Sequence, residues 1–126
     1  MADELILIVD DNEKNVKLAR DVLRFAGFRT LEAGTAGEGV SLAVEHVPDL
    51  VLMDIRLPDM DGGVALQRLK EDDRTAGIPV VALTSFAMKG DRERFLAAGF
   101  DGYLEKPITV REFPEQVRSH LASAAR

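Results

Sequence analysis

Cysteine, basic runs and membrane-length apolar windows are all missing from this chain of 126 residues. Without cysteine, disulfide bonds, thiolate metal sites and cysteine nucleophiles are excluded. Acidic residues outnumber basic residues by 22 to 16, and the net charge of −6 argues against nonspecific binding to nucleic acid or to an anionic membrane. No window approaches the length of a membrane span, and the N-terminus shows no charged leader or cleavage site. We therefore expect a cytoplasmic protein.

Linkers, internal repeats and low-complexity segments are missing as well. The residues that are present suit a folded domain, since 46% of them are hydrophobic and 30% are charged. We expect one domain over residues 1–122 and a short tail over residues 123–126, with no room for a separate output domain.

Five apolar segments predict β-strands, and amphipathic segments with helical spacing lie between them. Three of the strand segments are nearly continuous in Val, Ile and Leu, which is typical of strands buried on both faces of a parallel sheet. The alternation predicts an α/β doubly wound domain with five strands and five helices. The predicted strands are Leu5–Val9, Phe28–Glu32, Leu50–Met53, Val80–Thr84 and Gly102–Glu105.

Cap residues mark several of the predicted helix ends. The pairs Thr35–Glu38 and Thr109–Glu112 fit capping boxes, whose side chains accept hydrogen bonds from backbone N–H groups at the start of a helix. Gly27 and Gly99 lie where C-terminal caps belong, because glycine adopts the left-handed backbone of such caps without strain. Pro114 lacks an N–H, so we expect it to remove a hydrogen bond early in the last helix.

Polar side chains end or follow four of the predicted strands. In an open parallel sheet, ligands bind at the carboxyl ends of the strands, so we expect these side chains to converge on one edge. A plainer alternative is that the acids after the first strand only cap the helix that follows. The side chains in question are Asp10, Asp11, Asn12, Asp54, Thr84, Ser85 and Lys106.

Three carboxylates in one pocket repel one another, and at least one of them tends to keep its proton. A hard divalent cation removes this conflict, and oxygen-only ligands in a watery site suit Mg²⁺. The cation and Lys106 would neutralise an incoming phosphoryl group, which Asp54 is placed to attack and hold as an acyl phosphate. Thr84 offers a hydroxyl to the phosphoryl oxygens, and small Ser85 leaves the entrance open. Positioning and charge stabilisation are most of what phosphoryl transfer requires.

Four motifs in these regions carry a family resemblance: VDDN at 9–12, LMDIRLPDMDG at 52–62, LTS at 83–85 and LEKPI at 104–108. In this order and spacing they resemble the receiver domains of two-component response regulators, over essentially the whole chain. The resemblance implies a flavodoxin-like (βα)5 fold with strand order 2-1-3-4-5. Residues 82–108 are similar to single-domain regulators of the DivK type and to receivers of hybrid kinases.

The resemblance also implies a role for each site residue. Asp54 would be the phosphoacceptor, Thr84 and Lys106 would bind the phosphoryl group, and the bond between Lys106 and Pro107 would be cis. Asp10 would act through the metal's waters or directly. The implied ligands of Mg²⁺, or of Mn²⁺, are the side chains of Asp10, Asp11 and Asp54 and the backbone carbonyl of Arg56. Such a protein is not a conventional enzyme, although it can phosphorylate and dephosphorylate itself.

A conformational switch follows from the same resemblance. On phosphorylation Thr84 would move toward the phosphoryl group and Tyr103 would turn inward. The signalling surface would be the fourth helix, fifth strand and fifth helix. The phosphodonor would be a histidine kinase or a histidine phosphotransfer protein, the downstream protein target is unknown, and the chain would be a monomer or weak homodimer without direct contacts to nucleic acid or membrane.

The first helix offers a clue to the phosphodonor. Its apolar positions cover an arc of about 180°, more than the sheet alone requires. A docking patch for a helical, His-bearing phosphodonor would comprise Asn15, Leu18 and Ile108. For Val22 and Phe25 we expect packing against the last helix instead.

Other functions agree less well with the sequence. A receiver-fold adaptor that works without phosphorylation would not need the acidic cluster, Thr84 and Lys106. A haloacid-dehalogenase-like phosphatase would need a second Asp two residues after Asp54, where this chain has Arg56. A nucleotide or flavin binder would need a Gly-rich loop after the first strand. We expect Asp59 and Asp61 to shape the turn after Pro58 rather than to bind metal, and Phe86 to pack or to shield Asp54 from water.

Overall fold

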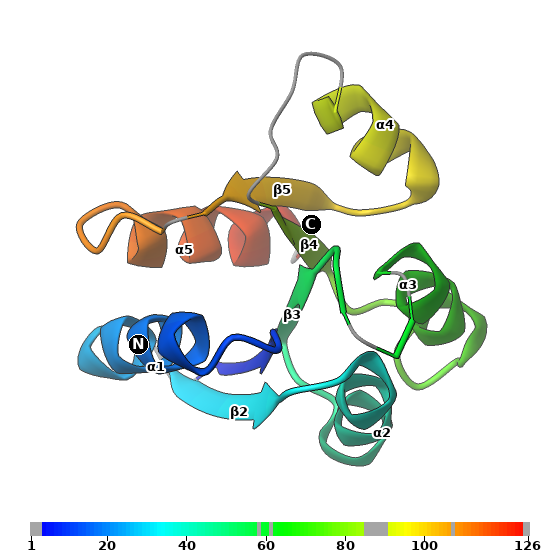
Figure 1. Ribbon diagram of the computed structural model, residues 1–126, viewed down its shortest axis with the longest axis horizontal. Coiled ribbons are helices and arrows are strands. Elements are labelled where there is room, and N and C mark those ends of the chain that lie inside the picture. Colours follow the sequence, from blue (N-terminus) through cyan, green and yellow to red (C-terminus); the bar gives the residue numbers. More distant parts are fainter. Residues whose placement is uncertain (1–3, 58, 61, 85–90, 107, 125–126) are drawn as a thin grey trace.

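All five predicted strands form, and they pair in one parallel sheet of order β2-β1-β3-β4-β5 (Figure 1). The computed structural model describes residues 4–57, 59–60, 62–84, 91–106 and 108–124, so the expectations for Pro58, Asp61, Ser85, Phe86 and Pro107 lie outside the described residues. The sheet contains β1 (Leu5–Val9), β2 (Arg29–Ala33), β3 (Leu50–Asp54), β4 (Val80–Thr84) and β5 (Gly102–Glu105).

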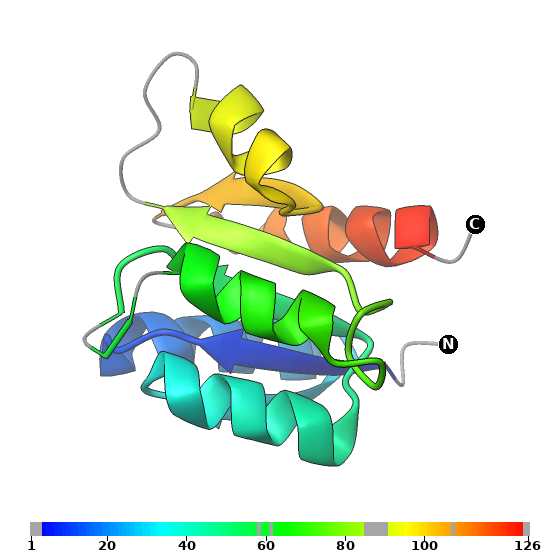
Figure 2. The ribbon, with the colours of Figure 1, turned by 90° about the vertical axis from the view of Figure 1, so that its right-hand side faces the viewer.

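Helices cover both faces of this sheet. One face carries α1 and α5, and the other carries α2 and α3, with α4 beside β5 (Figures 1 and 2). Among the described residues, no helix combines the length and the hydrophobicity that a membrane span requires. The helices are α1 (Glu13–Phe25), α2 (Ala36–His46), α3 (Gly62–Glu71), α4 (Asp91–Ala98) and α5 (Phe113–Ala124). The tail expected from residue 123 is therefore helical for its first two residues.

The central strands have apolar side chains on both faces, as their sequences predicted. Along β1, Leu7 and Val9 pack with the α2–α3 side, whereas Ile6 and Ile8 pack with the α1–α5 side. Every residue of β3 and β4 is buried. Two apolar layers of this kind account for the near-continuous runs of Val, Ile and Leu.

Two strands differ from their predicted bounds by one residue. β3 includes Asp54, which pairs with Leu83 of β4, so the carboxylate is the last side chain of the strand. β2 starts at Arg29 and not at Phe28, because the chain is still turning out of α1 there. The N–H of Phe28 donates to Leu23 O at 3.0 Å, and this bond closes the end of α1.

Most helix ends follow the sequence signals, but the second predicted capping box does not, because α5 begins at Phe113 and Thr109 is not its N-cap. Gly27 and Gly99 have φ values of 100° and 111°, which confirms both glycine caps. At the start of α2 the Thr35 hydroxyl accepts from the Glu38 N–H at 3.1 Å, and Glu38 Oε1 accepts from the Gly34 N–H at 2.9 Å. The first capping box is thus confirmed, with the glutamate reaching one residue farther back than usual.

The expectation for Pro114 was wrong. A turn precedes α5, in which the N–H groups of Glu112 and Phe113 both donate to Thr109 O. The helix itself begins at Phe113, so Pro114 lies in the first turn. A missing N–H costs nothing there, because first-turn N–H groups have no partner within the helix.

The prediction that Phe25 packs against the last helix was also wrong, although Val22 does pack into the core on the α1–α5 side. Phe25 is 96% exposed. The end of α1 is covered instead by Phe28, whose ring lies under the Arg118 guanidinium at 5.4 Å. Arg118 also donates to Ala26 O at 3.4 Å, so the space that Phe25 would need is already filled.

Only one side chain holds the described part of α4 against the sheet. Among residues 93–98, Phe95 alone is buried. Its ring packs edge-to-face on Phe100 and at a tilt on Tyr103, with centroids 6.1 Å apart in each pair. The attachment of α4 is therefore aromatic and local.

Val47 is the single non-glycine residue with positive φ in the described part of the chain. It caps the C-terminus of α2 with φ 46° and ψ 67°, and its N–H donates to Ala43 O at 2.8 Å. A β-branched side chain in this left-handed region is strained, and the strain costs of order 1–3 kcal/mol.

We expect Val47→Gly to raise the free energy of unfolding by about 1 kcal/mol, since the relief of strain exceeds the greater chain entropy of glycine. Urea unfolding measures the change. Val47→Ala is the matched control, because alanine shortens the side chain yet keeps the Cβ that conflicts with the backbone. A glycine variant no more stable than the alanine variant would contradict the assignment of strain to Cβ.

Candidate functional site

The carboxyl edge of the sheet gathers side chains from four strand ends. All strands point to this edge, because every neighbouring pair in the sheet is parallel (Figure 2). Asp10 directly follows β1, Asp54 ends β3, Thr84 ends β4, and Lys106 directly follows β5. Asp10, Asp54 and Thr84 are buried, whereas Asp11 is exposed at the entrance. The predicted convergence of these residues is therefore present.

Lys106 lies between two carboxylates. Its Nζ is 2.7 Å from Asp54 Oδ2 and 2.9 Å from Asp10 Oδ2, and only 12% of the Lys106 side chain is exposed. The backbone N–H of Lys106 also donates to Thr84 O at 2.8 Å, which fixes the start of this side chain to the end of β4. Charge-assisted bonds of this length, shielded from water, hold the ammonium in one place.

The remaining carboxylate oxygens are held by backbone N–H groups. Asp10 Oδ1 accepts from the Asn12 N–H at 2.9 Å, and Asp54 Oδ1 accepts from the Arg56 N–H at 2.9 Å. Asn12, in turn, caps α1 by accepting from Lys14 N and from Asn15 N. The capping alternative thus holds for Asn12, while Asp10 is directed into the site.

Burial raises the pKa of Asp54 above its ordinary value, and the hydrogen bonds from Lys106 and from the Arg56 N–H only partly oppose this rise. The nearby Asp10 carboxylate adds to it. For Lys106, burial by itself lowers the pKa, but hydrogen bonds to Asp54 and Asp10 outweigh burial and raise it. The ammonium therefore keeps its charge at neutral pH, and it is the main partner of two crowded acids.

Three carboxylates can offer oxygens to one cation. One oxygen from each of Asp10, Asp11 and Asp54 lies within 4.8 Å of the other two. Oxygen ligands with excess negative charge fit a hard divalent cation such as Mg²⁺. Arg56 is the fourth predicted ligand through its carbonyl, and its N–H bond to Asp54 fixes the adjoining peptide beside that carboxylate.

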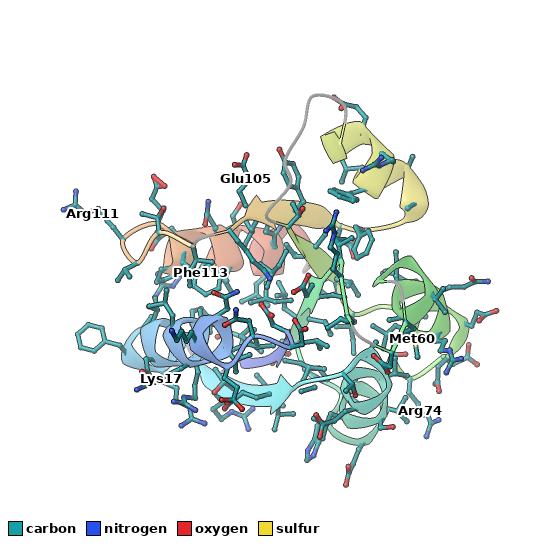
Figure 3. The ribbon with its side chains drawn as sticks, in the orientation of Figure 1. Lys17, Met60, Arg74, Glu105, Arg111 and Phe113 are labelled. Carbon is teal, nitrogen blue, oxygen red and sulfur yellow. The ribbon has the colours of Figure 1, made fainter. Side chains whose placement is uncertain are left out.

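The two predicted switch residues lie on neighbouring strands. Thr84 ends β4, and Tyr103 on the adjacent β5 pairs with Ala82. Tyr103 is half-buried, its ring packs on Phe95 of α4, and it lines an open cleft of about 670 Å³ beside β5 and α5. Figure 3 shows neighbouring Glu105 pointing outward from the same strand.

The predicted docking residues lie on the α1–α5 side of the sheet. Ile108 packs against the core beneath α1 and α5, Asn15 is half-buried, and Leu18 is 37% exposed. Figure 3 shows Phe113 pointing inward from α5 and Arg111 pointing away from the molecule. Leu18 is therefore the member of this set with the most accessible apolar surface.

Sequence reasoning missed one connection near the site. Asp59, expected only to shape its own turn, accepts from the N–H groups of Ala36 and Gly37, both at 2.8 Å. These bonds lower the pKa of Asp59. No local signal reveals them, because the partners lie 23 and 22 residues away along the chain.

Comparison with known proteins agrees with this geometry. The family model for the response regulator receiver domain matches residues 6–118. The chain belongs to this family. It is similar to the polar-differentiation response regulator DivK of Brucella anthropi, with 46% identity over 119 residues. The match covers 94% of this chain and 97% of the relative. It is thus a response regulator receiver of the CheY and DivK type, a class of signalling proteins rather than conventional enzymes.

Solved structures of receivers superpose on this chain. A CheY-like receiver from Methanospirillum hungatei JF-1 has a TM-score of 0.87 at 31% identity, with 98% of both chains covered. The receiver domain of a sensor histidine kinase from Pseudomonas aeruginosa PAO1 has a TM-score of 0.86 at 33% identity, covering 96% of this chain and 99% of the other. The latter structure has a magnesium ion coordinated in the active site cleft.

We expect Asp54→Asn to stabilise the metal-free protein at pH 7 by about 1 kcal/mol, or roughly 3 °C in Tm. Because burial raises the pKa of Asp54, its ionised form costs stability at neutral pH, and this cost disappears as pH falls through the raised pKa. Lys106 keeps Asp10 as its partner in the variant.

Thermal melts in EDTA at neutral and acidic pH check this expectation. Asp72→Asn is the control, since hydrogen bonds from Arg74 lower the pKa of that partly exposed carboxyl, and its removal should bring no gain. A stabilisation by Asp54→Asn that is unchanged at acidic pH would contradict the electrostatic cause.

Proposed function

We propose that this protein is a stand-alone response regulator of the cytoplasm, whose receiver domain spans residues 1–122. It accepts a phosphoryl group from a phosphohistidine onto Asp54. The observation that carries the proposal is the Lys106 ammonium at 2.7 Å from Asp54 and 2.9 Å from Asp10, with Asp11 completing the acidic cluster. A nucleophile, a fixed cation and a binding place for a second cation are thus within one pocket.

The transfer step forms a bond between a carboxylate oxygen of Asp54 and phosphorus. The bond from phosphorus to the imidazole nitrogen of the donor breaks, and its electron pair stays on that nitrogen. Lys106 exchanges its contact with Asp54 for the phosphoryl oxygens, and the Thr84 hydroxyl binds another of them. The side chains contribute position and charge, which suits a transition state with little covalent demand on the protein.

Asp10, Asp11, Asp54 and the Arg56 carbonyl would hold Mg²⁺, and Mn²⁺ suits the same oxygen ligands. When bound, the cation neutralises charge on the phosphoryl oxygens. Two features support this assignment: the three converging carboxylates, and the magnesium in the cleft of the similar Pseudomonas aeruginosa receiver.

Phosphorylation would bias a switch built from Thr84 and Tyr103. Movement of Thr84 toward the phosphoryl group would draw Tyr103 inward and away from Phe95, which is the one buried anchor of the described α4 residues. The surface of α4, β5 and α5 would then change its affinity for a downstream protein, or the phosphoryl group would be relayed onward.

Intact-mass measurement after incubation with acetyl phosphate tests the central step. We expect one added phosphoryl group in the presence of Mg²⁺, and none with EDTA or in Asp54→Asn. Asp49→Asn is a control carboxylate, since it lies at the opposite end of β3 and accepts from Leu5 N. Failure of both acetyl phosphate and phosphorylated histidine kinases to modify the wild-type chain would favour the phosphorylation-independent adaptor.

The docking patch of Asn15, Leu18 and Ile108 has its own test. We expect Leu18→Asp to slow transfer from a phosphorylated histidine donor at least about tenfold, because a buried interface charge without a partner is costly. Transfer from acetyl phosphate should not change. Val64→Asp on α3, at 44% exposure, is a matched control, and equal slowing by both variants would contradict a specific patch.

A further inference from the structure

Asp59 connects the β3–α3 loop, which follows Asp54, to the first turn of α2. Its two carboxylate oxygens bind separate N–H groups in the first turn of α2, and Asp59 itself belongs to the loop between β3 and α3. N–H groups in the first turn of a helix lack partners within that helix, and the helix dipole favours a carboxylate beside them. Neither bond requires Asp59 to be buried.

The α2 end of this connection is fixed relative to Asp10. A Cβ on Gly39 of α2 would lie 2.7 Å from Val9 Cγ2, so the helix rests directly on the last residue of β1. The N–H of Asp10 donates to Ala33 O at 3.0 Å, which ties the end of β2 to the same place. Because α2 follows β2 closely, its first turn has a defined position relative to Asp10.

The β3–α3 loop is equally constrained at its two ends, where it leaves β3 and where it enters α3. The Gly62 N–H donates to Ile55 O at 3.1 Å, and a Cβ on Gly62 would lie 3.0 Å from Asp54 O and from Ile55 Cα. Leu57 is buried and Met60 packs against the core on the side where α2 and α3 lie (Figure 3). These apolar contacts set the depth of the loop, but they have no directional preference along the surface.

Asp59 supplies that direction through hydrogen bonds. We propose that Asp59 is a positioning residue of the cation site, which holds the β3–α3 loop on α2 and thereby sets the separation of the two loops that carry the cation's ligands. The inference rests on the proposed function, because it concerns the site of Asp10, Asp11, Asp54 and the Arg56 carbonyl. Asp59 itself is not a ligand in this scheme, in agreement with the expectation from its sequence context.

Titration of the full chain with Mg²⁺, followed by backbone amide NMR shifts, tests the proposal. We expect Asp59→Ala to weaken Mg²⁺ binding about tenfold, the lower end of what loss of a ligand-orienting partner costs. Asp59→Asn should lie between wild type and Asp59→Ala, because one amide oxygen can replace only one of the two acceptor oxygens. This graded recovery distinguishes orientation from a change in net charge, since both variants lose the same charge.

Glu38→Ala is the matched control. It also removes an exposed carboxylate that accepts a backbone N–H at the start of α2, but its partner Gly34 lies on the adjoining turn and not on the β3–α3 loop. We expect lower thermal stability in both alanine variants and weaker Mg²⁺ binding in Asp59→Ala alone.

Three results would overturn the proposal. One is equal Mg²⁺ affinity of Asp59→Ala and wild type, and another is an equal loss in Glu38→Ala. In both cases the proposed receiver function stands, because the wild-type chain binds Mg²⁺. Absence of Mg²⁺ binding by the wild-type chain would overturn the cation site and this inference together.

Discussion

The Lys106 ammonium between Asp10 and Asp54 is the interaction on which the rest of the site depends. Two buried carboxylates at the end of adjacent strands would repel each other strongly without a cation between them. Lys106 comes from the far edge of the sheet, after β5, so the pairing joins the ends of β1, β3 and β5 across the intervening β4. The ion pairs that balance charge in the metal-free protein therefore also hold these strand ends, and the functional residues on them, together.

This arrangement bears on the proposed phosphorylation, in which one pocket would serve both a resting and a phosphorylated state. In the resting state the Lys106 ammonium lies 2.9 Å from Asp10 and 2.7 Å from Asp54 and offsets part of their negative charge. Under the proposed function, an arriving phosphoryl group would meet an ammonium that is already in the pocket and need not be brought in from solvent. Preorganised charge of this kind lowers the cost of reorganisation during transfer.

Much of the site was predictable because the carboxyl ends of parallel strands lie at the same edge of the sheet. Asp10, Asp54, Thr84 and Lys106 each follow or end a recognisable apolar run, so the topology alone brings them to one edge. Asp59 was not predictable in its capping role, since its bonds depend on how a loop is laid across a helix start. Phe25 was mispredicted for a related reason: helical spacing gives its direction, but not the fact that Phe28 and Arg118 already cover that end of α1.

The single anchor of α4 has a thermodynamic meaning for signalling. Apart from Phe95, residues 93–98 leave their side chains accessible, so releasing this part of the helix forfeits the burial of about one aromatic side chain, of order 1.5–3 kcal/mol. That amount is comparable with the free energies that usually couple two sites in a regulatory protein. Phe95 packs against Tyr103. A modification that shifts Tyr103 therefore needs to supply only a modest free energy to change the relative populations of the attached and released states of α4. The described part of α4 is thus weakly tethered, whereas the central strands β1, β3 and β4, which position the acidic site, are tightly packed.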